Sequence, residues 1–335
     1  MTLSQPAKGW LKLVATVAVS VLFFYLFLRG LDLDEVADAL VEADYLYVPL
    51  ALGLFALSLV VRAMRWQVFY RPDNISLRIL FPAMLVTYAG NNLLPLRAGE
   101  LIRAQLLMER AGLSRMRTLG TAAVERLFDI LVLGGFVLFG IFLGDIGFAF
   151  VAVGLVLFAS CIAGLALACL VANRPDLPGK IAANWTLLPL RWRSRLADYS
   201  EWFAGGFSVL KSAEGFTQAS ALTALAWLLE FGMYWLLAVA FSIDSGFLRV
   251  AFAGSAANLA LSVPFSQAGI GPFQVVAKEA LLKFGVAANL AAAYVLALHV
   301  LLVVPVSLAG LLVLWAMLPR RQPVVQPRPS TDSPV

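Results

Sequence analysis

Residues 91–104, with the sequence NNLLPLRAGELIRA, decide how this chain is organised. They follow residues 79–90, ILFPAMLVTYAG, an apolar run shorter than the roughly 20 residues that a helix needs to cross a bilayer. Polar side chains and the helix breaker Pro95 then stand where a spanning helix would continue through lipid. Irregular backbone at membrane depth is tolerated only beside protein or a water-filled cavity, so the stretch predicts a polar cavity inside the protein.

The composition indicates a protein whose surroundings are largely lipid. Of the 335 residues, 61% are hydrophobic and only 13% are charged, and the mean hydropathy is +0.87. The net charge of +5 suits anionic lipid headgroups better than nucleic acid, which is not expected as a partner. Cys161 and Cys169 lie in one apolar run and offer neither a disulfide framework nor metal-ligand spacing, so no metal or cofactor is expected.

Long apolar runs predict an all-α, polytopic integral membrane protein with about six full transmembrane helices. The first run lacks a small-residue cleavage site and is expected to be an uncleaved span rather than a signal peptide. The six runs lie near residues 10–29, 45–62, 118–143, 147–172, 216–242 and 286–318.

The charges between the runs predict the topology. Residues 32–44 carry six acidic side chains and no Lys or Arg, whereas arginines lie on both flanks of the broken segment 79–96. Because positive loops prefer the cytoplasm, the broken segment is expected to enter and return as a re-entrant hairpin near residues 79–110. The arginines interpreted as loop charges are Arg62, Arg65, Arg71 and Arg78 before the segment and Arg97, Arg103, Arg110, Arg115 and Arg117 after it.

A second broken segment, near residues 247–284, contains NLALSVPFSQAGIG at 258–271. The span count closes only if this segment enters from the outer face as an oppositely oriented re-entrant hairpin, although Lys278 and Lys283 count against that placement. Opposed broken helices are typical of inverted repeats that meet near the membrane midplane and form a substrate site.

The remaining organisation follows from composition. Residues 191–213 mix aromatic and basic side chains and predict an amphipathic helix on the membrane surface. Residues 319–335 are rich in Pro and Ser and are expected to form a disordered cytoplasmic tail after a single transmembrane domain over 1–318. The protein is expected in the cell inner (cytoplasmic) membrane, as a multi-pass protein with both termini cytoplasmic; homo-oligomers remain open.

The segment TAAVERLFDILVLGG, residues 121–135, holds the sharpest intramembrane charge cluster. Glu125 and Asp129 are four residues apart and share a helix face, and Arg126 lies three residues before Asp129. Charges inside a membrane are costly, so the cluster is either a structural ion pair or part of a polar path for a lipid headgroup. Glu230 lies near mid-span and needs a partner, for which Arg126 is one candidate; His299 is the single histidine, suited to packing or to proton relay.

No catalytic constellation is present: one histidine allows no Ser-His-Asp arrangement, and no phosphate-binding glycine-rich loop occurs. We therefore expect a protein that is not an enzyme.

Several stretches together resemble the lysylphosphatidylglycerol synthase transmembrane region family, described as flippase-like membrane proteins. The resemblance covers about residues 8–318 and is carried by NNLLPLRAGELIRAQLL (91–107), TAAVERLFDILVL (121–133), PFSQAGIGPFQ (264–274) and LLKFGV (281–286). It implies a membrane part that moves a lipid between leaflets. The soluble aminoacyltransferase domain of the family's synthases is not expected here, and neither is synthase activity. By resemblance, Gln274 stands where a glutamate is expected and His299 where an arginine is common, so one ion pair could have become Gln and His, or the headgroup could differ.

Together these observations predict a lipid translocase acting on a phospholipid, glycolipid or isoprenoid-type lipid. Its cavity is expected to be lined by Asn91, Asn92, Arg97, Glu125, Arg126 and Glu230, with an anionic phospholipid or glycolipid as the partner. The alternatives are a non-transporting partner that binds a lipid or a lipid-modifying enzyme through Arg191, Arg193 and Arg195, and a membrane-embedded lipid transferase. The full set of candidate substrate-binding residues is Asn91, Asn92, Pro95, Arg97, Glu100, Arg103, Glu125, Arg126, Asp129, Glu230, Asn258, Pro264, Gln267, Gly269, Gly271, Gln274 and His299.

Overall fold

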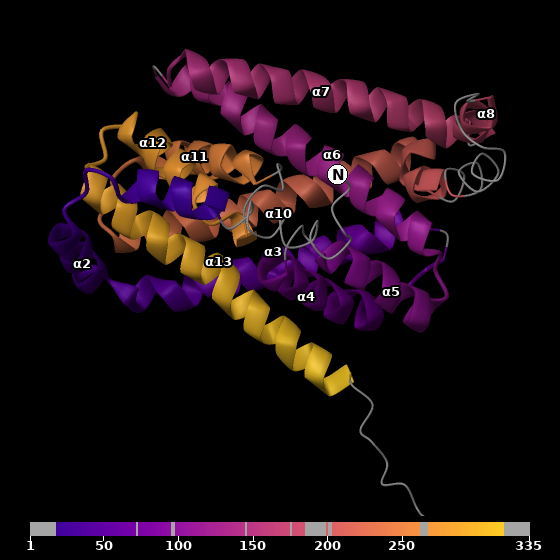
Figure 1. Ribbon diagram of the computed structural model, residues 1–335, viewed down its shortest axis with the longest axis horizontal. Helices are drawn as coiled ribbons and strands as arrows, with labels where there is room; N and C mark the ends of the chain where they lie inside the picture. The colour runs from indigo at the N-terminus through magenta and orange to yellow at the C-terminus, as the bar shows by residue number, and fades with distance from the viewer. Residues whose placement is uncertain are drawn as a thin grey trace, which may run out of the picture.

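The computed structural model describes residues 18–71, 73–94, 98–144, 146–174, 176–184, 199, 203–261 and 267–317, and every regular element within these ranges is a helix (Figure 1). This confirms the predicted all-α class. After an apolar helix over Ala18–Leu28, the α-helices are α2 (Leu33–Glu42), α3 (Val48–Phe69), α4 (Leu77–Leu93), α5 (Gly99–Ala111), α6 (Arg115–Phe139), α7 (Phe148–Asn173), α8 (Asp176–Asn184), α10 (Ala213–Ala240), α11 (Gly246–Ala260), α12 (Pro272–Leu282) and α13 (Ala288–Met317). Short 3-10 helices are η1 (Tyr45–Tyr47), η3 (Gly140–Leu143), η4 (Gly205–Lys211) and η5 (Gln267–Gly269).

Within the described ranges, five helices are long and apolar enough to cross a membrane. They coincide with the last five of the six predicted spans, so the chain is a polytopic membrane protein. The first predicted span is described only over Ala18–Leu28, and its earlier residues lie outside the described part. The five helices run over Tyr45–Phe69, Arg115–Leu143, Phe148–Asn173, Ala213–Ala240 and Ala288–Met317.

Local sequence signals set several helix boundaries. The Asp32 carboxylate accepts hydrogen bonds from the first backbone N–H groups of α2, and the Ser76 and Ser212 hydroxyls do the same at the starts of α4 and α10. Helix α5 ends at Gly112, whose φ of 68° is the left-handed conformation that glycine adopts without strain. Local sequence therefore sets these boundaries, through side-chain caps at three helix starts and a glycine at the end of α5.

The two interrupted segments form two helical hairpins, α4–α5 and α11–α12. In Figure 1 they lie toward opposite ends of the long helices, and η5, at the tip of the second hairpin, contacts α4. The arms of the first hairpin meet at the backbone, because a Cβ atom on Gly90 would lie 2.7 Å from the Cα of Gly99. Each arm has 11 to 17 residues, shorter than a full span. Insertion of the hairpins from opposite membrane faces stays a prediction.

Lys278, which counted against an outer-face hairpin, is buried in α12 with 6% of its surface exposed. Its ammonium donates a hydrogen bond of 2.8 Å to the Phe27 carbonyl oxygen and lies over the Phe27 ring. Because this charge contacts the first helix rather than a headgroup surface, it carries little information about topology.

Of the surface helix predicted over residues 191–213, only Tyr199 and residues 203–213 lie in the described part. Its last part forms η4, which buries Phe207, Val209 and Leu210 and packs against α6 and α7. This part is therefore integrated into the helix bundle. The predicted tail at 319–335 lies outside the described residues.

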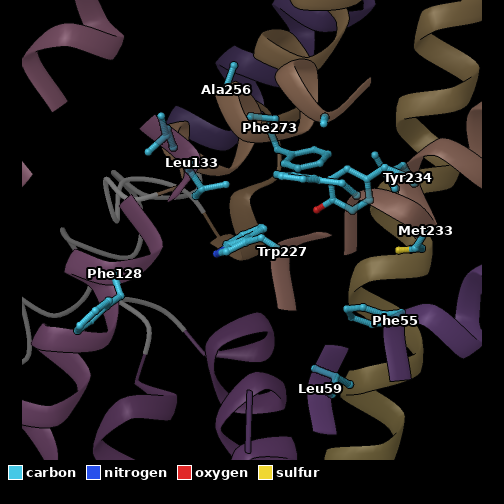
Figure 2. Close-up of a cluster of buried hydrophobic side chains, with 14 of the residues drawn as sticks. Phe55, Leu59, Phe128, Leu133, Trp227, Met233, Tyr234, Ala256 and Phe273 are labelled. Carbon is cyan, nitrogen blue, oxygen red and sulfur yellow. The ribbon is translucent and has the colours of Figure 1, made fainter. Parts of the chain in front are cut away.

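Helix α10 packs along α3, and α13 packs along α4. Figure 2 shows Phe55, Trp227 and Phe273 in the buried cluster, contributed by α3, α10 and α12 respectively. Sequence-distant elements thus converge on one region, which also contains the polar side chains described next.

Candidate functional site: a buried charged cluster beside a polar cavity

The structure corrects the interpretation of Arg62 and Arg65 as loop charges. Helix α3 continues to Phe69, so both arginines lie inside the helix, with 3% and 0% of their surfaces exposed. They belong to a charged cluster, which we define as Arg62, Arg65, Glu100, Arg103, Glu125, Arg126, Asp129 and Glu230.

Glu125 on α6 is held between two arginines from different elements. Its Oε1 accepts hydrogen bonds from Arg65 Nη2 at 2.5 Å and Trp66 Nε1 at 3.0 Å, and its Oε2 accepts one from Arg103 Nη1 at 2.8 Å. The Arg103 guanidinium also lies over the Trp66 ring, 3.4 Å from its centroid. Glu125 therefore joins α3, α5 and α6.

Asp129, one helical turn further along α6, joins the same cluster to α10. Its Oδ1 accepts hydrogen bonds from Arg65 Nη1 at 2.6 Å and Trp227 Nε1 at 3.1 Å. The predicted shared face of Glu125 and Asp129 is confirmed, since Arg65 contacts both carboxylates.

The partner of Glu230 is Arg62, and the suggested pairing with Arg126 is wrong. Arg62 Nη2 donates to Glu230 Oε2 at 2.8 Å, while the Tyr234 hydroxyl donates to Oε1 at 2.8 Å. Asn258 on α11 in turn donates to the Tyr234 hydroxyl at 3.0 Å. These contacts extend the cluster across α3, α10 and the second hairpin.

Arg126 differs from the other arginines of the charged cluster in exposure. Its side chain is 41% exposed, whereas those of Arg62, Arg65 and Arg103 are at most 4% exposed. It donates to Glu100 Oε1 at 3.1 Å and lies 3.9 Å from Asp129. The cluster holds four arginines and four carboxylates, so its formal charges balance.

A polar cavity of about 130 Å³ adjoins the charged cluster. At the roughly 30 Å³ that a water molecule takes up in the liquid, it has room for about four waters or one small polar group. Its charged and amide lining consists of Arg62, Asn91, Asn92, Arg126, Asp129, Glu230 and Asn258. Its ring lining consists of Phe55, Tyr88, Trp227, Phe273 and His299.

Three lining residues, Arg62, Asn91 and His299, carry buried polar atoms without a hydrogen-bond partner among the described residues, that of Arg62 being Nε. Both ring nitrogens of His299 are buried and unpaired, and the ring packs 5.3 Å from the Phe273 ring. The Asn91 Oδ1 is also unpaired, although its amide nitrogen donates to Glu100. Leaving buried polar groups unsatisfied is costly, so these atoms are suited to a polar guest in the cavity.

The sequence suggested that Gln274 and His299 could replace an ion pair, but the two side chains do not form a hydrogen bond with each other. Gln274 Oε1 instead accepts a hydrogen bond of 2.7 Å from the Gly271 backbone N–H and caps the start of α12. Gly269 and Gly271 have φ values of 78° and 98°, so both turn the backbone at the tip of the second hairpin. These residues shape the tip, and Gln274 does not line the cavity.

The structure brings Asn91, Asn92, Arg126, Asp129, Glu230, Asn258 and His299 together around the polar cavity. Glu100, Arg103 and Glu125 do not line it but support it through the charged cluster, which corrects the expectation that Glu125 is a lining residue. Pro95, Arg97, Pro264 and the side chain of Gln267 lie outside the described residues. Their roles stay predictions.

Sequence reasoning missed Arg62, Arg65, Trp66 and Trp227. In a sequence, arginines at the end of an apolar run look the same whether they lie in a loop or point into the protein. The presence of Arg62 and Arg65 therefore did not indicate that they are buried. The usable signal was spacing, since Arg62, Arg65 and Trp66 fall on one helix face at intervals of three and four. In the part of the chain that the structure describes, no group of three or more His, Cys, Asp or Glu could hold a metal ion.

The family profile described as lysylphosphatidylglycerol synthase TM region matches residues 13–310. The chain belongs to this family. A relative named UPF0104 membrane protein, from Methanothermobacter thermautotrophicus, is 27% identical over 258 residues, covering 71% of this chain and 75% of that protein. Glycosyltransferase AglD of Haloferax volcanii is 29% identical over 125 residues, which cover 37% of this chain and only 20% of AglD. No solved structure matches the chain significantly.

Proposed function

We propose that this family member is a lipid translocase, which moves an anionic phospholipid, a glycolipid or an isoprenoid-type lipid between membrane leaflets. The single observation that carries the proposal is the polar cavity, which lies inside a membrane protein where the tips of two interrupted hairpins approach each other. Polar cavities at broken helices are the usual substrate sites of membrane transporters.

Arg126 is the residue best suited to hold a lipid phosphate. It lines the polar cavity and is the most exposed arginine of the charged cluster, whereas Arg65 and Arg103 are each committed to buried carboxylates. A guanidinium offers a planar fork of donors that matches phosphate oxygens. His299 and Asn91 add unpaired polar atoms on the same lining.

In the proposed mechanism the headgroup enters the polar cavity while the acyl chains stay in the bilayer. A cavity of about 130 Å³ accommodates only a small polar group, so passage requires the hairpins to move apart. Opposed rocking of the α4–α5 and α11–α12 hairpins would open the cavity to each leaflet in turn. Glu100 also pairs with Arg103 at 3.5 Å, so Arg126 would exchange Glu100 for a phosphate oxygen without leaving that carboxylate unpaired.

The proposal is one of transport without catalysis, at the cell inner membrane, with both termini cytoplasmic. The relative AglD is named a glycosyltransferase, which supports a glycolipid or a lipid-modifying enzyme as the partner. Nucleic acid is not proposed as a partner.

The test is leaflet-resolved movement of headgroup-labelled native lipids in proteoliposomes. Arg126→Gln is expected to slow movement roughly tenfold or more, because one charge-assisted hydrogen bond to the substrate is lost. Arg71→Gln is the matched control, since Arg71 forms an exposed ion pair with Glu214 at 3.3 Å away from the polar cavity. It should move lipid at the wild-type rate.

Equal rates for wild type, Arg126→Gln and protein-free vesicles, with folded protein, would reject transport. The partner-binding alternative would then gain support if neutral replacements at Arg191, Arg193 and Arg195 abolished recovery of a partner. A covalently altered lipid in the same vesicles would instead support a lipid transferase.

A further inference from the structure

A second, apolar groove of about 310 Å³ lies between α6, α7 and the second hairpin. Its lining is almost wholly hydrocarbon, and α7, which forms one wall, is largely exposed along its length. Part of the lining consists of small residues, namely Gly154, Ala256 and Ala260. A Cβ atom on Gly154 would approach Val137 Cγ1 to 2.8 Å, so α6 and α7 approach closely at this position.

A small cavity of about 50 Å³ adjoins the polar cavity along α6. It shares Arg126, Asp129 and Asn258 with the polar cavity and adds Leu133 of α6. Leu133 and Val137 are four residues apart on α6 and share a face, and Val137 lines the apolar groove. On α11, which packs against α6, Asn258 lines the small cavity, while Ala256 and Ala260, four residues apart and on another face of the helix, line the apolar groove.

We infer that the apolar groove holds one acyl chain of a lipid whose headgroup lies in the polar cavity. The inference rests on the proposed function and adds the route by which the lipid joins the protein, namely laterally between α6 and α11. The ordering of surfaces matches a lipid: a cation at Arg126, then the mixed surface at Leu133, then pure hydrocarbon at Val137. In a bilayer the occupant of an apolar groove open to the side is a lipid chain, since no competing apolar solute is as abundant.

The first experiment uses phosphatidylglycerol with a photoreactive diazirine on one acyl chain, in vesicles that contain the full-length protein. Crosslinked residues are identified by mass spectrometry. Adducts are expected at Val153 and Leu157, which line the groove, more often than at Val156 and Leu167, which are exposed on α7 outside it. In Arg126→Gln, groove labelling should fall roughly tenfold, as expected for one lost charge-assisted hydrogen bond, while labelling at Val156 and Leu167 stays constant.

The second experiment fills the groove. Ala149→Trp places a large side chain at an exposed position that lines the groove, and Ala166→Trp is the matched control on the same helix, exposed but outside the groove. Ala149→Trp is expected to lower groove labelling and lipid movement severalfold, whereas Ala166→Trp should lower neither of them.

The inference is overturned if labelling at the groove equals labelling at Val156 and Leu167 in every variant, even where wild-type protein moves lipid. If no lipid moves but groove labelling still depends on Arg126, the acyl-chain site is supported and the translocase proposal is rejected.

Discussion

At the residue scale, Glu125 is the carboxylate on which most of the buried charge converges. It contacts Arg65, Trp66 and Arg103, and 6% of its surface is exposed. Glu125→Gln would leave two buried guanidinium groups short of a counter-charge, and such losses cost about 3–5 kcal/mol. Unfolding in detergent, followed by temperature or denaturant, should report this loss of stability.

Glu214→Gln provides the comparison for Glu125→Gln. Glu214 pairs with Arg71 at 3.3 Å, and its side chain is 72% exposed. Exposed pairs contribute about 0–1 kcal/mol, so this variant should unfold close to wild type. Similar losses in the two variants would show that the charged cluster does not hold the helices together.

His299 is expected to separate stability from transport. Both of its ring nitrogens are unpaired in the described structure, so His299→Leu removes no hydrogen bond and should change stability by less than about 1 kcal/mol. Because the ring lines the polar cavity, the same variant should slow lipid movement severalfold in proteoliposomes. A destabilised protein with unchanged transport per folded molecule would instead assign His299 to packing alone.

At the element scale, α13 lies against α4 with no room for a side chain at Gly310. A Cβ atom there would lie 2.3 Å from the Leu85 carbonyl oxygen. Gly310→Ala should force the two helices apart and lower stability by about 1–3 kcal/mol, the usual cost of overpacking. Thermal unfolding in detergent is the measurement.

Gly135 on α6 is the control position, because a Cβ atom there meets nothing within 4 Å. Gly135→Ala should leave stability unchanged or raise it by up to about 1 kcal/mol, the difference in helix propensity. If Gly135→Ala were as harmful as Gly310→Ala, the close α4–α13 approach would not be the cause.

The elements themselves could be predicted from the sequence because their signals are local. Run length identified the spans, and Pro95 with its flanking arginines identified the first interruption. The direction in which an arginine points depends on residues far away in the sequence. Arg62 and Arg65 point into the protein because they pair with carboxylates on α10 and α6. Which side chains line the polar cavity depends on those tertiary pairings, so Glu125 was expected there and instead lies behind the lining.

At the scale of the whole molecule, the two ends of α10 should face opposite sides of the membrane. Asp44 N–H donates to the Ala240 carbonyl oxygen at 2.8 Å, which places the acidic α2 region at one end, while Lys211 precedes the other end. A helix of 28 residues is roughly 42 Å long at about 1.5 Å per residue, enough to cross a bilayer.

Single cysteines at Val41 and Lys211 test this arrangement, in a background where Cys161 and Cys169 are replaced by alanine. A membrane-impermeant thiol reagent applied to intact cells should label Val41→Cys, and should label Lys211→Cys only after the membrane is opened. The expectation follows from the acidic loop before α3 and the basic residues after it. Labelling of both positions from one side would refute the assigned topology.

The pairing of Arg62 and Arg65 with later helices has a consequence for biogenesis. An arginine at the centre of an isolated membrane helix costs about 2.5–3.5 kcal/mol on insertion scales. Arg62 and Arg65 lie in the C-terminal third of α3, where the cost is smaller but still unfavourable, and their partners on α6 and α10 are synthesised only afterwards. Chains truncated after α3 should therefore insert less completely than chains extended through α6, as read by an engineered glycosylation site; equal insertion would contradict this. Helix α3 would then wait at the insertion machinery until its counter-charges emerge from the ribosome, so that assembly of the charged cluster and release into lipid become one event.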